Sequence, residues 1–207
     1  MKIAVINEFS AKEKNEFILA ALEPFDVQVH NVGMSPDNNG QELTYIHTGL
    51  MAGLSLATKA ADLVVGGCGT GQGFTISAMQ YPGVYCGLIT NSLDAWLFSQ
   101  INDGNCVSLA LNKGFGWAGD IELKYIFEKL FADTPGQGYP PQRSEVQKKS
   151  RKILSEISIT SHKSFTDILK AIDPAVLSHV VAHKPFIDFI QAHGEQGELK
   201  DLILANA

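Results

Sequence analysis

A chain of 207 residues with 45% hydrophobic and 18% charged residues can bury one large domain, or a domain with an appendage. Its formal charge of −6 argues against a nucleic-acid partner, because such surfaces cluster lysine and arginine. No apolar segment approaches the roughly 20 residues that span a bilayer, so no membrane partner is expected.

The cysteine usage and the first residues indicate the compartment. Cys68, Cys86 and Cys106 are an odd number of cysteines without metal-ligand spacing. Residues 1–6 predict a strand rather than a signal peptide, because no apolar h-region or cleavage site follows them. We therefore expect a reduced, cytoplasmic protein.

Short β-rich runs alternate with helical patterns over the first two thirds of the chain. We expect strands at 2–7, 26–31, 62–67, 84–90 and 105–111, and helices at 10–22, 42–60, 72–80, 93–101 and 121–131. Ser10 and Glu13 match a capping box for the first helix. Strands that alternate with helices form βαβ units, so the sequence predicts an α/β fold, a three-layer Rossmann-like sandwich with a five-stranded parallel sheet.

The composition changes after Asp133, where a loop rich in proline and glycine begins. Beyond this loop only helical patterns follow, at 146–157, 165–172, 174–182, 185–192 and 198–204. We therefore divide the chain into a Rossmann-like domain over residues 1–146 and a helical C-terminal extension over residues 147–207. The apolar stripe of Phe165, Ile168, Leu169 and Ile172 indicates core packing or a dimer contact.

Two groups of polar residues in the extension are expected to be solvated helix faces. One is the basic run Lys148, Lys149, Arg151 and Lys152. The other is His179 and His183, which are four residues apart, as metal ligands on a helix can be, but which lack a third ligand in a fixed pattern. We expect no metal site.

Residues 66–73, GGCGTGQG, contain five glycines directly after an apolar strand pattern. At the end of a parallel strand, such a turn offers free backbone N–H groups to a bound anion or to an oxyanion that develops during a reaction. Neither G-x-G-x-x-G nor a Gly-Lys-Ser/Thr sequence is present, which argues against a nucleotide.

Cys68 lies inside this cluster, at the expected start of a helix. The helix dipole and the nearby N–H groups favour a thiolate, which can act as a nucleophile or as a general base. The alternative is a small buried residue that ends a strand, because free cysteine is commonly buried. Cys86 and Cys106 are assigned to the core.

Three segments and one tyrosine resemble the ribose-5-phosphate isomerase B and galactose-6-phosphate isomerase family: Gly67–Gly73, Ile76–Ala78, Asn102–Asn105 and Tyr45. The resemblance covers roughly residues 1–146. It implies an enzyme that interconverts aldose and ketose through an enediolate, with active sites shared between the two subunits of a homodimer. Such proton transfer needs only a base and oxyanion donors, so no cofactor is expected.

The resemblance also implies roles for single residues. Cys68 would be the general base, Thr70 would assist ring opening, and Asn102 with the N–H groups of Gly69 and Gly71 would hold the enediolate oxygen. The expected substrate-binding residues are Glu8, Tyr45, His47, Gly69, Gly71, Gly73, Asn105 and Arg143. His47 has an ordinary surface histidine as its alternative, and Glu8 has a routine turn carboxylate as its alternative.

Several family positions carry other residues in this chain. Phe9 and Ile101 replace histidines, Asn112 replaces an arginine, and of the late GGRHxxR segment only the last arginine, Arg143, remains. A phosphate dianion usually needs two or more charge-assisted partners. We therefore expect a sugar acid or an unphosphorylated sugar as substrate, such as 4-deoxy-5-hexosulose uronate. The alternatives are a pentose or hexose phosphate isomerase and a non-catalytic sugar-binding relative.

Overall fold

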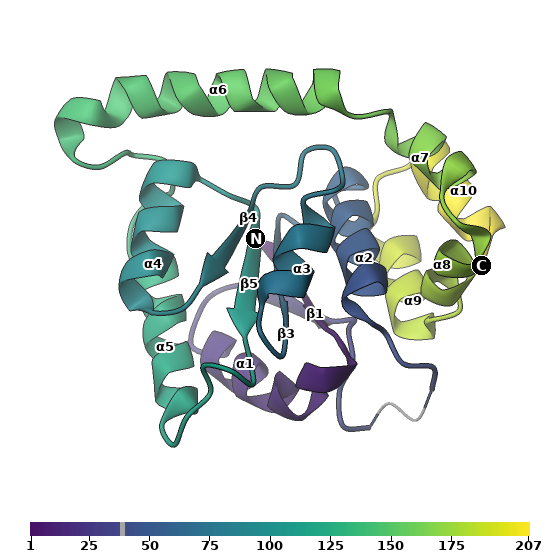
Figure 1. Ribbon diagram of the computed structural model, residues 1–207, viewed down its shortest axis with the longest axis horizontal. Helices are drawn as coiled ribbons and strands as arrows, with labels where there is room; N and C mark the ends of the chain where they lie inside the picture. The colour runs from purple at the N-terminus through teal and green to yellow at the C-terminus, as the bar shows by residue number, and fades with distance from the viewer. Residues whose placement is uncertain (38–39) are drawn as a thin grey trace.

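The computed structural model describes residues 1–37 and 40–207. These residues form a five-stranded parallel sheet in the order β2-β1-β3-β5-β4. The strands are β1 (Lys2–Asn7), β2 (Gln28–Asn31), β3 (Leu63–Cys68), β4 (Cys86–Ile89) and β5 (Cys106–Ala110). The expected Rossmann-like α/β fold is confirmed (Figure 1).

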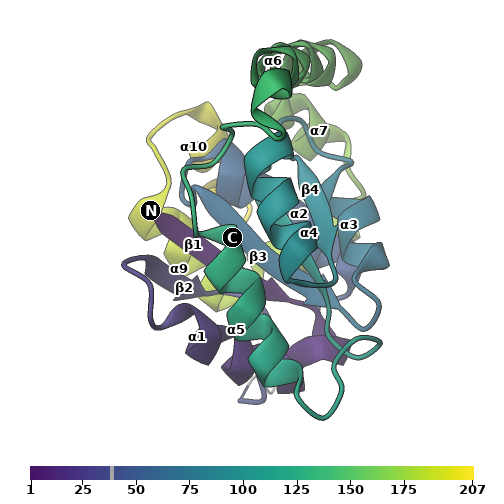
Figure 2. The ribbon, with the colours of Figure 1, turned by 90° about the vertical axis from the view of Figure 1, so that its left-hand side faces the viewer.

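Helices cover both faces of the sheet (Figure 2). One face carries α1 (Asn15–Leu22), α4 (Ser92–Leu97) and α5 (Gly119–Leu130), and the other carries α2 (Tyr45–Ala57) and α3 (Gln72–Ala78). Successive residues of β1 alternate between the two faces, with Val5 on the first and Ile6 on the second. Since both faces are buried, the strands read as continuous apolar runs.

The strand order brings three strand ends together. Asn7 of β1 is in register with Gly67 of β3, and Cys68 of β3 is in register with Ala110 of β5. β2 pairs with one side of β1, and β3 pairs with its other side, so the direction of strand addition reverses at β1. Ligands of open α/β sheets bind at such a reversal, beyond the carboxyl ends of the strands.

The local structure differs from the expected helices at two places. The segment after β1 begins with a 3-10 turn over Phe9–Lys14, which Glu8 caps, so the expected capping box of Ser10 is wrong. The helix expected at 93–101 ends at Leu97 and is followed by a π-helical turn over Phe98–Asn102.

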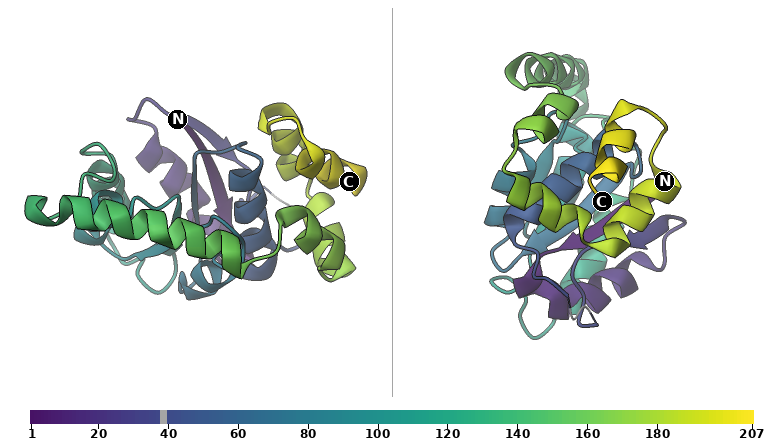
Figure 3. Two further views of the ribbon diagram at one scale, coloured as in Figure 1. Left: turned by 90° about the horizontal axis from the view of Figure 1, so that it is seen from above. Right: turned by 90° about the vertical axis from the view of Figure 1, so that its right-hand side faces the viewer.

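The helices of the C-terminal extension, the first of which begins three residues before the expected boundary at residue 147, are α6 (Ser144–Ser161), α7 (Phe165–Ala171), α8 (Pro174–Val181), α9 (Lys184–His193) and α10 (Glu198–Ala205). α6 runs along the amino-terminal edge of the sheet and buries none of its residues, whereas α7 to α10 gather beside α2 (Figures 1 and 3). Phe165 and Leu169 are buried in the core that α2 shares, with Ile168 and Ile172 packed against it, so core packing is the correct interpretation of that stripe. Neither α6 nor any other helix of the described residues has the length and apolarity to cross a membrane.

Candidate active site

Cys68 is the last residue of β3 and is buried, with 6% of its surface exposed. Its Sγ lies 3.8 Å from the Oγ1 of Thr70, which in turn accepts the backbone N–H of Gln72 at 3.3 Å. The thiol and the hydroxyl therefore face each other at the start of α3, where the helix dipole favours negative charge.

Two glycines of the loop are required by its geometry. Gly71 caps the N-terminus of α3 with a φ of 73°, a backbone conformation that residues with a side chain rarely adopt. A Cβ on Gly73 would lie 3.0 Å from the Tyr45 ring. Tyr45, at the first turn of α2, therefore packs directly on residues 66–73, the glycine loop.

The two N–H groups that were expected to hold an oxyanion have partners within the chain. The Gly69 N–H donates to the Ser10 hydroxyl at 3.0 Å, and the Gly71 N–H donates to the carbonyl oxygen of Cys68 at 3.3 Å. The second bond is long for an N–H···O contact, so the Gly71 group is the one more readily transferred to a ligand.

Glu8 lies beside this loop because β1 and β3 are neighbours. Its backbone N–H donates to the Gly67 carbonyl at 3.1 Å, and its carboxylate accepts from the hydroxyl and the backbone N–H of Ser10. Asn112, which follows β5, donates to the Ser10 carbonyl at 2.8 Å. Ser10 thus joins the loops after three strands, a role hidden in the sequence by its likeness to a helix cap.

His47 makes its contacts away from the glycine loop. Its Nδ1 accepts the backbone N–H of Thr44 at 3.0 Å, and its ring stacks on His179 of α8. Burial, and to a lesser extent His179, lowers the pKa of His47 to about 4. The structure places a neutral His47 at the contact between α2 and the extension.

His179 lies in α8 and His183 follows its C-terminal end. The expectation that these two histidines form a solvated helix face was wrong. His179 donates to the Glu42 carbonyl at 2.7 Å, and His183 donates to the Val32 carbonyl at 3.0 Å. Both therefore fasten the extension to the loop between β2 and α2. Sequence spacing could not show this, because the acceptors are more than 130 residues away.

Asn102 and Asn105 precede β5 and therefore lie at the amino-terminal edge of the sheet, opposite Cys68. Both polar groups of the Asn105 side chain are bonded at 2.8 Å, to the Tyr85 N–H and the Gly83 carbonyl. Asn102 lines a cavity of about 520 Å³ beneath α6. One chain alone does not bring these two residues to Cys68.

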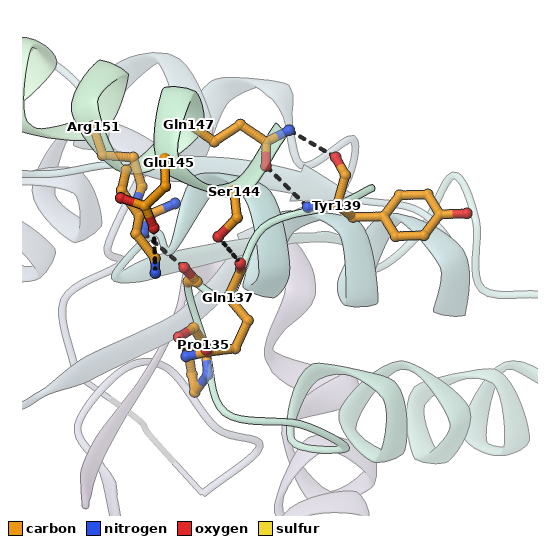
Figure 4. A network of polar contacts seen from close by, with 9 residues as sticks. Pro135, Gln137, Tyr139, Ser144, Glu145, Gln147 and Arg151 are labelled. Carbon is orange, nitrogen blue, oxygen red and sulfur yellow. Dashed lines mark hydrogen bonds and ion pairs between the residues drawn. The ribbon is translucent and has the colours of Figure 1, made fainter. Parts of the chain in front are cut away.

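Arg143 ends the short turn Pro141–Arg143 that leads into α6, also away from Cys68. The preceding loop is held against α6 by Gln147, which bonds the backbone N–H and carbonyl of Tyr139 at 2.9 and 2.7 Å (Figure 4). Arg151 donates to the carbonyls of Ile101 and Gly136, both at 2.9 Å. Arg151 thus joins α6 to the two loops that contain these carbonyls, and its assignment to a solvated face was wrong.

The comparisons with known proteins agree with this architecture. A family model described as Ribose/Galactose Isomerase matches residues 3–143. Crystal structures of 4-deoxy-L-threo-5-hexosulose-uronate ketol-isomerase complexed with a tartrate and of ribose-5-phosphate isomerase LacAB_rpiB from Vibrio parahaemolyticus are 37% and 40% identical to the chain. Each has a TM-score of 0.95, and each match covers 100% of this chain and 99% of the other. No curated protein sequence matches.

A more distant structure shares the fold alone. Ribose 5-phosphate isomerase from Thermotoga maritima is 22% identical, with a TM-score of 0.58 over 75% of this chain and 97% of its own. The two structures that match the whole chain also match its C-terminal helices, which lie beyond the family model.

The family model and the two structures that match the whole chain identify an enzyme of the sugar isomerase class. The chain belongs to the ribose/galactose isomerase family, as its motifs had indicated. It is accordingly an aldose–ketose isomerase.

Proposed function

We propose that this protein interconverts an aldose and a ketose through an enediolate, with Cys68 as the general base, and that its substrate is a sugar acid or an unphosphorylated sugar such as 4-deoxy-5-hexosulose uronate. The observation that carries this proposal is the Cys68–Thr70 pair, 3.8 Å apart at the start of α3. One full-length relative is a uronate isomerase and the other a ribose-5-phosphate isomerase. A sugar phosphate is therefore the second candidate.

The chemistry follows from these positions. The Cys68 thiolate removes the proton from the carbon beside the carbonyl, and the electron pair of that C–H bond moves toward the carbonyl oxygen. The Gly71 N–H and the positive end of α3 stabilise the charge on this oxygen. Cys68 then returns the proton to the former carbonyl carbon, and the hydroxyl proton of the adjacent carbon passes to the first oxygen, so that the second oxygen becomes the carbonyl. The Thr70 hydroxyl assists ring opening before this transfer.

The proposed site is completed by a second copy of the chain, because Asn102 and Arg143 lie at the sheet edge opposite Cys68. α6 supports this homodimer, since it carries exposed apolar residues and buries none. These residues are Val146, Ile153, Leu154, Ile157 and Ile159. Asn102 of the partner subunit and the partner's Arg143 would then approach Cys68.

The preference for a non-phosphorylated substrate rests on the missing cations. Where a phosphate cradle would need several charged groups, this chain has Phe9, Ile101 and Asn112. Because the base must remain a thiol, the proposal also includes a reducing compartment such as the cytoplasm.

The test is proton exchange in deuterated water, followed by NMR at the carbon beside the carbonyl of each candidate sugar. We expect the wild type to exchange and isomerise 4-deoxy-5-hexosulose uronate, Cys68→Ala to lose both activities, and Cys86→Ala to retain them as the matched control. Exchange that persists unchanged in Cys68→Ala would contradict the assigned base. Faster turnover of ribose 5-phosphate than of any uronate would favour the second candidate.

A further inference from the structure

A cavity of about 250 Å³ lies beside the Cys68 loop, between the carboxyl ends of β4 and β5 and the start of α5. Its walls are mainly apolar, and its polar lining comes from a few side chains. These are Thr70, Thr90, Lys113 and Glu122. Thr70 belongs both to this lining and to the Cys68 pair, so the cavity continues the candidate active site.

Lys113 is tied to the same loop through its backbone, because its N–H donates to the Gly69 carbonyl at 2.8 Å. Its ammonium group has no ion-pair partner within residues 1–37 and 40–207. The cations that line two other cavities are paired, Arg151 with Asp103 and Lys184 with Asp188. Within the described residues Lys113 is thus an exposed, unpaired cation beside a mainly apolar cavity.

The other charged groups near this cavity have partners of their own. The Glu122 carboxylate, which also lines the cavity, keeps its negative charge and accepts the backbone N–H of Ser92 at 3.1 Å, at the start of α4. The Lys14 ammonium lies over the Phe115 ring, 4.9 Å from its centre. Lys113 therefore remains as the group that can take the charge of an incoming anion.

We propose that this cavity binds the anionic end of the substrate and that Lys113, rather than Arg143, selects a carboxylate there. The inference rests on the proposed function and deepens it. A sugar acid with its carbonyl at Cys68 extends past Thr70 toward the Lys113 ammonium. One ammonium balances the single charge of a carboxylate. A phosphate, with a charge of about −2, would need a second cation.

Binding of tartrate, measured by calorimetry on the full chain, tests Lys113 without relying on turnover. We expect Lys113→Met to weaken tartrate binding by about tenfold or more, the loss typical of one charge-assisted hydrogen bond. Lys113→Arg should retain binding. Lys124→Met, which removes the same charge from an exposed position of α5, is the matched control and should bind as the wild type does. Circular dichroism and the thermal midpoint confirm that each variant is folded.

Kinetics separates binding from chemistry. Lys113→Met should raise KM for a uronate by about tenfold with little change in kcat. Equal tartrate affinity of Lys113→Met and wild type overturns the inference, as does a wild type that binds no tartrate or a loss seen only in Arg143→Met. A wild type that binds tartrate through Lys113 but isomerises no sugar acid would overturn the proposed function and leave the carboxylate site in place.

Discussion

The imidazole rings of His47 and His179 stack with their centres 3.9 Å apart and their planes inclined by 9°. His47 belongs to the first turn of α2, which also presents Tyr45 to the glycine loop, and His179 belongs to α8. The stack therefore joins the C-terminal extension to the helix that borders the candidate active site.

This stack predicts that the protein loses stability in mild acid. Because the pKa of His47 is lowered to about 4, its contribution to stability is complete above the unfolded value of about 6.5 and decreases as the pH falls from there toward about 4. Burial also lowers the pKa of His30 and of His183, and both act in the same direction. The measurement is the thermal midpoint between pH 4 and pH 8.

His47→Gln is the informative variant for this effect, and its midpoint should depend less on pH than that of the wild type over this window. His162→Gln, at the end of α6, is the control and should retain the wild-type dependence. Identical pH profiles of His47→Gln and wild type would contradict the assignment.

Ser10→Ala is expected to lower kcat by about tenfold with a smaller change in KM, because Ser10 is a positioning residue that links the Glu8 carboxylate to the Gly69 N–H. The thermal midpoint should change little, because one hydrogen bond contributes about 1 kcal/mol to the free energy of unfolding. Ser10→Thr retains the hydroxyl and should restore part of the activity. Ser150→Ala, which removes a serine hydroxyl bonded within α6, should leave both constants unchanged.

Gly73→Ala should reduce activity by displacing Tyr45, whose ring lies 3.0 Å from the position of the added Cβ. In a Tyr45→Ala background the same substitution meets no ring and should cost little more, so a double-mutant cycle on kcat/KM should show coupling. Gly197→Ala has open space around its Cβ and is the control. Additive losses would show that Gly73 acts independently of Tyr45.

A shared active site predicts complementation between two inactive variants. Cys68→Ala and Asn102→Ala should each be inactive alone, and mixing them should restore activity, because a mixed dimer has one intact site. Random exchange makes half of the dimers mixed, so about a quarter of the wild-type activity is expected. Native mass spectrometry would verify subunit exchange. If mixed dimers form and remain inactive, Asn102 does not act across an interface.

Much of the fold is readable from local pattern. All five strands lie where apolar runs alternate with helical periodicity, and all helices of the extension were anticipated. The differences are at helix ends, as at Ser10, which does not cap the helix because Glu8 caps the turn and the Ser10 hydroxyl accepts the N–H of Gly69, 59 residues away. The local sequence pattern cannot predict such a contact, because the contact depends on which strands become neighbours in the sheet.

For the candidate site, the sequence was sufficient to propose Cys68, Thr70 and the glycine loop, because a loop that must begin a helix and approach other backbone closely needs small residues at adjacent positions. Only the tertiary structure decided what surrounds them. It placed β5 between β3 and β4, which brings Lys113 to the glycine loop and leaves Asn102 and Arg143 at the far edge. It also turned His47 toward the extension. The physical reason is that strand order and helix docking are set by burial of distant apolar faces against one another, whereas sequence periodicity records only that each face exists.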